Sequence, residues 1–174
     1  MDLKSYIRAI PDWPKPGVMF RDITTLLKDA HAFSYVIDKL YERYKRADID
    51  LVAGIESRGF IFGAVLANKL NKGFIPIRKE GKLPYRTEKE TYKLEYASAT
   101  VEVHIDAIPK GARILIVDDL IATGGTAIAA ANLIEKLGGN VVEFSFVIGL
   151  PGLKGMAKLS EKYEVITLVD FEGE

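Results

Sequence analysis

Short apolar runs alternate with amphipathic segments along this chain, and that alternation restricts the folds it can adopt. Residues 33–46 place apolar side chains at helical spacing with charged side chains opposite, which predicts an amphipathic helix. Residues 50–55 form a short apolar run that ends at a polar loop, and helical spacing resumes over 60–70. The order strand, loop, helix is the repeating unit of an α/β fold.

The same order recurs towards the end of the chain. Residues 73–79 and 112–119 are apolar runs too short for helices, 126–137 has helical spacing, and 141–150 and 164–171 are two more short runs. Such alternation predicts one α/β domain over all 174 residues. We expect a central, mostly parallel sheet flanked by helices, with ligands bound at the carboxyl ends of its strands.

Two segments depart from this pattern. Within a stretch 78–108, residues 91–108 alternate with period two in two arms around 97–99, which predicts an antiparallel hairpin after a basic loop. The first 25 residues are expected to form a small cap, because closely spaced prolines exclude a helix there. These prolines are Pro11, Pro14 and Pro16.

The composition excludes several classes of function. Lysine and arginine number 24 and aspartate and glutamate 24, so no global charge favours a nucleic acid or an anionic membrane. No cysteine is present, which excludes disulfides and thiolate nucleophiles. No apolar stretch approaches the ~20 residues that cross a bilayer, and we expect a soluble, cytoplasmic protein.

The strongest motif is IVDDLIATGGTA, residues 116–127. It places Asp118 and Asp119 at the carboxyl end of a strand, where paired carboxylates are tolerable if they face hydroxyl groups or a metal. Small residues follow, so backbone amides and the dipole of the next helix could cradle a phosphate. The alternative is a simple turn whose polar side chains cap the helix. The small residues are Ala122, Thr123, Gly124, Gly125 and Thr126.

This run resembles the phosphoribosyl pyrophosphate motif of type I phosphoribosyltransferases. The resemblance implies that Asp118 and Asp119 hold the ribose 2- and 3-hydroxyls and that Ala122 to Thr126 bind the 5-phosphate. It also implies a Mg²⁺ ion near the two carboxylates, held through ligand and water and not by direct protein ligands.

Three further segments resemble the adenine-using members of the family. The first is PGVMFRDIT, residues 16–24, and the resemblance places Met19, Phe20 and Arg21 at adenine, together with Leu120. The alternative for Phe20 is an ordinary core position.

The second segment is the loop that contains Glu56, Ser57 and Arg58. Arginine is well shaped for bidentate phosphate contacts, and the resemblance assigns Ser57 and Arg58 to pyrophosphate, with Arg58 also acting in catalysis. In that family the peptide at this place is often cis, which leaves open whether the peptide between Glu56 and Ser57 is cis or trans. The alternative is a solvated pair of Glu56 and Arg58.

The third segment joins a basic loop to a carboxylate. Arg78, Lys79 and Lys82 suit a mobile lid that closes on a polyanion, although a basic loop by itself is often solvated surface. The resemblance assigns these three residues to pyrophosphate and makes Glu95 of the Leu-Glu-Tyr sequence catalytic.

Taken together, the resemblance implies transfer of ribose 5-phosphate from phosphoribosyl pyrophosphate to adenine, giving AMP and pyrophosphate, in a homodimer. One rival is a 6-oxopurine enzyme, in which a lysine shortly after the phosphate loop meets the oxo group; here Ala127 to Ala131 stand there. The other is a nucleotide-sensing regulator, which would need a basic reading element for nucleic acid.

Overall fold

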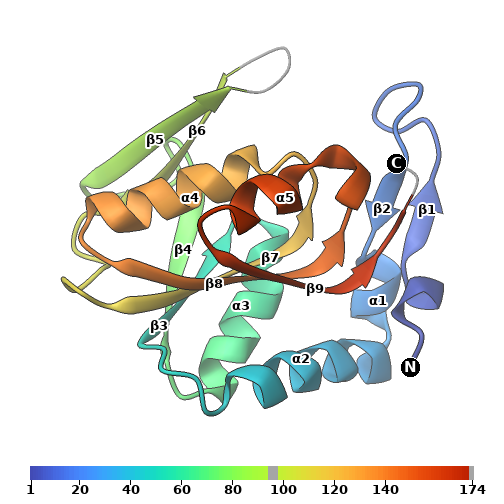
Figure 1. Cartoon of the computed structure of the whole chain (residues 1–174), viewed down its shortest axis with the longest axis horizontal. Coiled ribbons are helices and arrows are strands. Elements are labelled where there is room, and N and C mark those ends of the chain that lie inside the picture. Colours follow the sequence, from blue (N-terminus) through green and yellow to red (C-terminus); the bar gives the residue numbers. More distant parts are fainter. Residues whose placement is uncertain (94–97, 173–174) are drawn as a thin grey trace.

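The computed structural model describes residues 1–93 and 98–172 of the chain. In this part, seven strands form one sheet in the order β5-β6-β4-β3-β7-β8-β9, and β1 and β2 form a small second sheet (Figure 1). The strands are β1 (Arg8–Ile10), β2 (Phe20–Asp22), β3 (Leu51–Ile55), β4 (Gly73–Lys79), β5 (Thr87–Lys93), β6 (Ser98–His104), β7 (Arg113–Ile121), β8 (Asn140–Gly149) and β9 (Glu164–Asp170). The helices are α1 (Thr24–Lys28), α2 (Ala30–Tyr44), α3 (Arg58–Lys69), α4 (Gly125–Lys136) and α5 (Gly155–Ser160), with 3₁₀ turns η1 (Leu3–Tyr6) and η2 (Pro151–Leu153).

The sheet carries a helical layer on each face (Figure 1). Central strand β7 shows why, because its side chains alternate between two apolar clusters. Ile114 and Ile116 pack in the cluster that contains the alanine-rich face of α4, whereas Leu115 and Val117 pack with α2 and α3. A strand that is buried on both faces has a continuous run of apolar residues in its sequence, and such a run predicted this strand.

The α/β fold class and the parallel centre of the sheet are confirmed. Strands β4, β3, β7, β8 and β9 pair in parallel, while β5 and β6 form an antiparallel hairpin that joins the edge of β4. No helix in residues 1–93 or 98–172 is long and apolar enough to cross a membrane.

The hairpin differs in its bounds from the prediction. It begins at Thr87 and not at 91, and it ends at His104 and not at 108. Ser98 and Ala99, predicted in the turn, instead belong to β6 and pair with Lys93 and Tyr92. The first residues of β5 show no alternation of apolar and polar side chains in the sequence. This edge strand is largely solvated, so charged side chains stand on both of its faces. Helices α1 and α5 were not predicted, since five or six residues carry too little periodicity.

Glycines allow α3 to approach the sheet closely enough to place its first turn beside the end of β7. A Cβ atom at Gly59 would stand 2.7 Å from the carbonyl oxygen of Val117 and 2.8 Å from Oδ1 of Asp118. A Cβ atom at Gly63, one turn later, would meet only side-chain or more distant atoms, with Cε2 of Phe74 nearest at 3.0 Å. The main chain of β7 therefore restricts position 59 more severely than position 63.

We predict that Gly59→Ala lowers the free energy of unfolding by about 1–3 kcal/mol, the usual cost of overpacking against atoms that cannot move aside. Gly63→Ala is the matched control on the same helix, because both variants gain helix propensity of up to about 1 kcal/mol. Urea unfolding followed by circular dichroism should rank Gly59→Ala below Gly63→Ala. Equal stabilities would contradict the assignment of position 59 as the tight contact.

Candidate active site

A cavity of about 270 Å³ opens at the carboxyl ends of β3 and β7. Three segments line it: the β3–α3 loop, the end of β7, and the β7–α4 loop with the start of α4. Most of the site residues predicted from the sequence are among its lining residues. They are Ser57, Arg58, Asp118, Asp119, Leu120, Ala122, Thr123, Gly124, Gly125 and Thr126, joined by Ile55, Glu56, Ile121, Ala127 and Phe146.

The two aspartates are held differently. Oδ1 of Asp118 accepts a hydrogen bond from the backbone N–H of Asp119 at 2.8 Å. Asp119 is 3% exposed, and its Oδ2 lies 2.7 Å from Nε of Arg58 in an ion pair. Burial raises the pKa of Asp118 well above its usual range, with the charge of Asp119 adding to the effect. Burial also raises the pKa of Asp119, against the opposing charge of Arg58.

The loop after β7 is shaped for close approach by a ligand. Gly124 has a φ of +80°, which L side chains rarely adopt, and it immediately precedes α4. Gly155 packs against this loop, and its backbone N–H donates to the carbonyl of Ala122 at 3.0 Å. A Cβ atom at Gly155 would stand 2.1 Å from that oxygen. The sequence analysis missed Gly155, because nothing local marks a glycine after β8 as a partner of this loop.

The cap residues Met19, Phe20 and Arg21 are not among the lining residues of the cavity, and Phe20 lies next to one of them. The guanidinium of Arg58 lies 5.4 Å from the ring centre of Phe20, and that ring packs edge-on against Trp13. Arg21 instead stacks over the ring of Phe171 at 3.9 Å, and Met19 is 37% exposed. The structure thus brings Phe20 to Arg58, while Arg21 contacts the end of the chain.

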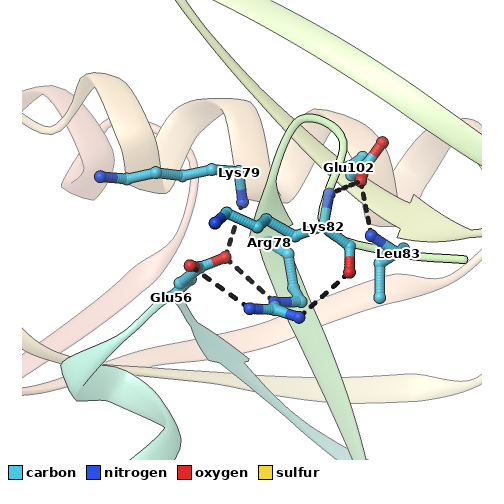
Figure 2. A network of polar contacts seen from close by, with 6 residues as sticks. All are labelled: Glu56, Arg78, Lys79, Lys82, Leu83 and Glu102. Carbon is cyan, nitrogen blue, oxygen red and sulfur yellow. Dashed lines mark hydrogen bonds and ion pairs between the residues drawn. The ribbon is translucent and has the colours of Figure 1, made fainter.

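The basic loop is organised by two carboxylates (Figure 2). Glu56, which lines the cavity, accepts hydrogen bonds from Nε of Arg78 at 3.1 Å and from the backbone N–H of Lys79 at 3.0 Å. Burial acts to raise the pKa of Glu56, but these donors outweigh it and the pKa is lowered. Glu102, 2% exposed, accepts from the backbone N–H groups of Lys82 and Leu83. Arg78 also donates to the carbonyl of Lys82 at 3.1 Å.

Two questions raised by the sequence remain. The peptide between Glu56 and Ser57 is cis, which the sequence analysis had left open. Glu95 lies outside the described residues, so its catalytic role stays a prediction.

Comparison with known proteins identifies the arrangement. Residues 24–173 match the phosphoribosyl transferase domain. The chain belongs to the phosphoribosyltransferase family. It is 57% identical to the adenine phosphoribosyltransferase of Desulfosudis oleivorans over the whole of both chains. The crystal structure of the Thermoanaerobacter pseudethanolicus adenine phosphoribosyltransferase superposes with a TM-score of 0.94 at 49% identity, covering 98% of each chain. The Saccharomyces cerevisiae enzyme, crystallised with adenine and an imino-altritol bisphosphate, gives 0.90 at 42% identity, covering 97% of each.

The donor set fits the way in which Mg²⁺ is commonly bound beside phosphates. This ion usually keeps several waters and takes one or two carboxylates plus phosphate oxygens, not an all-protein cage. Residues 1–93 and 98–172 contain no cluster of three or more potential ligands among His, Cys, Asp and Glu. Two adjacent carboxylates, the buried Asp119 and the half-buried Asp118, at a phosphoribosyltransferase cavity therefore suit an ion held through ligand and water.

The raised pKa of Asp118 makes a prediction about stability. The folded chain holds this proton more tightly than the unfolded chain, so stability falls as pH rises from the unfolded pKa through the folded one. Asp118→Asn keeps the Oδ1 acceptor and removes the charge. It should raise the free energy of unfolding at pH 8, and the gain should shrink towards pH 4.

Urea unfolding at several pH values measures this effect, with the exposed Asp106→Asn as the matched control. Asp106→Asn should show no comparable dependence on pH. A loss of stability in Asp118→Asn at pH 8 would mean that the carboxylate stabilises the fold.

Proposed function

We propose that this chain transfers ribose 5-phosphate from phosphoribosyl pyrophosphate to adenine, releasing AMP and pyrophosphate. The observation that carries the proposal is the juxtaposition of two adjacent carboxylates, one buried and one half-buried, with a glycine-rich loop at a helix N-terminus, in one cavity. An ionised carboxylate only accepts hydrogen bonds, so it suits the hydroxyl groups of a sugar, which can donate them. Phosphate oxygens accept hydrogen bonds, so they suit a loop whose backbone N–H groups donate. The names of the full-length relatives support adenine as the base.

Each lining segment then has a separate part in the reaction. Asp118 and Asp119 accept hydrogen bonds from the ribose hydroxyls, and residues 122–126 surround the 5-phosphate. Arg58 and Ser57 meet the pyrophosphate, and Arg58 is placed to offset the negative charge that develops on it as the bond to C1 breaks. Its 2.7 Å ion pair with Asp119 holds the guanidinium at the cavity.

The basic loop supplies further positive charge. Lys79, Lys82 and Arg78 would complete the pyrophosphate site. Arg78 donates a hydrogen bond from Nε to Glu56, which lines the cavity. Closure of this loop would exclude water, which otherwise competes with adenine for the reacting carbon. When bound, Mg²⁺ would add electrostatic neutralisation of the pyrophosphate beside Asp118 and Asp119.

The base is expected on the side of the cap. Phe20 lies next to Arg58 and offers an aromatic face, with Met19, Arg21 and Leu120 completing the proposed adenine site. Glu95 would accept or relay the proton that adenine loses as the new bond forms. The homodimer and the cytoplasmic location stay predictions from the sequence.

The experiment that tests the function is a panel of purines. With phosphoribosyl pyrophosphate and magnesium, adenine should give AMP, while hypoxanthine, guanine and xanthine should react at least about a hundredfold more slowly. Buried groups matched to one base leave the wrong base with unpaired polar atoms. Chromatographic separation of the nucleotides measures all four reactions. Faster formation of a 6-oxopurine nucleotide would favour the rival substrate class.

The catalytic role of Glu95 has its own test. Glu95→Gln should lower single-turnover AMP formation by about a hundredfold or more, because a positioned acid or base contributes on that scale. Binding of phosphoribosyl pyrophosphate, measured by calorimetry, should barely change. The nearby Glu88→Gln on β5 is the control and should react at the parental rate. An unaltered chemical step in Glu95→Gln would remove this residue from the catalytic set.

A further inference from the structure

The hydroxyl of Tyr92 reaches the phosphate loop from outside the cavity. Its Oη lies 2.8 Å from Oγ1 of Thr126, within hydrogen-bond distance, and either atom could be the donor. Thr126 lines the cavity and stands in the first turn of α4, whereas Tyr92 is not among the lining residues. The Tyr92 ring also rests on the loop, because a Cβ atom at Gly125 would stand 3.2 Å from it.

This contact is part of a docked surface between β5 and α4. Glu90, two residues before Tyr92 and on the same side of the strand, accepts from Nδ2 of Asn132 at 2.9 Å and from Nζ of Lys136 at 2.6 Å. Strand β5 lies beside α4 (Figure 1). Asn132 and Lys136 bind it near the C-terminus of the helix, and Thr126 binds it at the N-terminus. The position of the Tyr92 hydroxyl is therefore set by several contacts.

The direction of this hydrogen bond matters because each hydroxyl carries a single proton. A phosphate oxygen at neutral pH accepts hydrogen bonds, so Thr126 can bind it only by donating its own proton. Thr126 must then accept from Tyr92, which becomes the donor. Without a donor at Tyr92, the Thr126 hydroxyl proton would be free to rotate away from the cavity. Its hydrogen bond to the phosphate would then be weaker.

We infer that Tyr92 is a positioning residue for the 5-phosphate: it donates to Thr126 Oγ1 and thereby directs the Thr126 proton into the cavity. The inference rests on the proposed function, in that it takes residues 122–126 as the 5-phosphate site. Because Tyr92 stands on β5, three residues before Glu95 in the sequence, the same bond connects the occupied phosphate loop with the strand that leads to the proposed proton acceptor.

Tyr92→Phe removes the hydroxyl and keeps the ring on Gly125. It should weaken the binding of AMP, which carries the 5-phosphate, by about threefold to tenfold, the scale of one hydrogen bond. Binding of pyrophosphate, which lacks that group, should be unchanged in the presence of magnesium. Isothermal titration calorimetry measures both ligands, and steady-state kinetics should show a higher KM for phosphoribosyl pyrophosphate with a smaller change in kcat.

Variants of Thr126 decide whether the effect passes through that side chain. In a Thr126→Ser background, which retains the hydroxyl, Tyr92→Phe should still weaken AMP binding by a similar factor. In a Thr126→Val background it should add nothing, as expected for two residues that act through one contact. Glu90→Gln is the docking control: it weakens the ion pair with Lys136 without touching Thr126, and AMP binding should stay within about twofold of the parent.

Three results with Tyr92→Phe would overturn the inference. They are unchanged AMP affinity in Tyr92→Phe, an equal loss in the Thr126→Val background, and an equal loss of pyrophosphate affinity. Unchanged AMP affinity in Thr126→Val alone would also overturn it, because Tyr92 would then have no phosphate ligand to orient. AMP formation by the parent chain tests the proposed function separately, and its success would stand whichever of these results occurred.

Discussion

The ion pair between Arg58 and Asp119 joins the first turn of α3 to the end of β7, and both residues line the cavity. A buried carboxylate next to a half-buried one is costly, and desolvation accordingly raises the pKa of both. One guanidinium offsets part of that cost, and it can reach Asp119 only because Gly59 lets α3 approach β7 at backbone distance. Helix packing, strand order and site electrostatics therefore depend on one another.

A second pair of carboxylates shapes the basic loop, and it does so mainly through the main chain. Glu102 accepts from the backbone N–H groups of Lys82 and Leu83, while Glu56 accepts from the backbone N–H of Lys79 as well as from Arg78. These backbone bonds fix the path of the loop without engaging the ammonium groups of the two lysines. The loop can thus be ordered and still present positive charge to an anion, which agrees with the proposed pyrophosphate site.

Much of the fold follows from local pattern. The apolar run before Asp118 predicted a central strand, and the small residues after it predicted a loop that opens a helix; both are present. The hairpin bounds were displaced because the solvated face of β5 carries charged residues that weaken its alternation. Elements as short as α5 show too little periodicity to be predicted, although α5 supplies Gly155, which donates a hydrogen bond to the β7–α4 loop at Ala122.

The predicted site residues that meet at the cavity are those that follow β3 and β7 directly, because parallel strands place their carboxyl ends at one edge. Partners from other parts of the chain could not be predicted in this way. Tyr92 and Thr126 are 34 residues apart and lie on a hairpin and a helix, so only tertiary packing makes them neighbours. An inward-facing tyrosine on an edge strand is usually explained by apolar burial alone. Its hydroxyl acquires a role only if the neighbouring loop binds phosphate as proposed, which is why such positioning groups are found from the structure and not from the sequence.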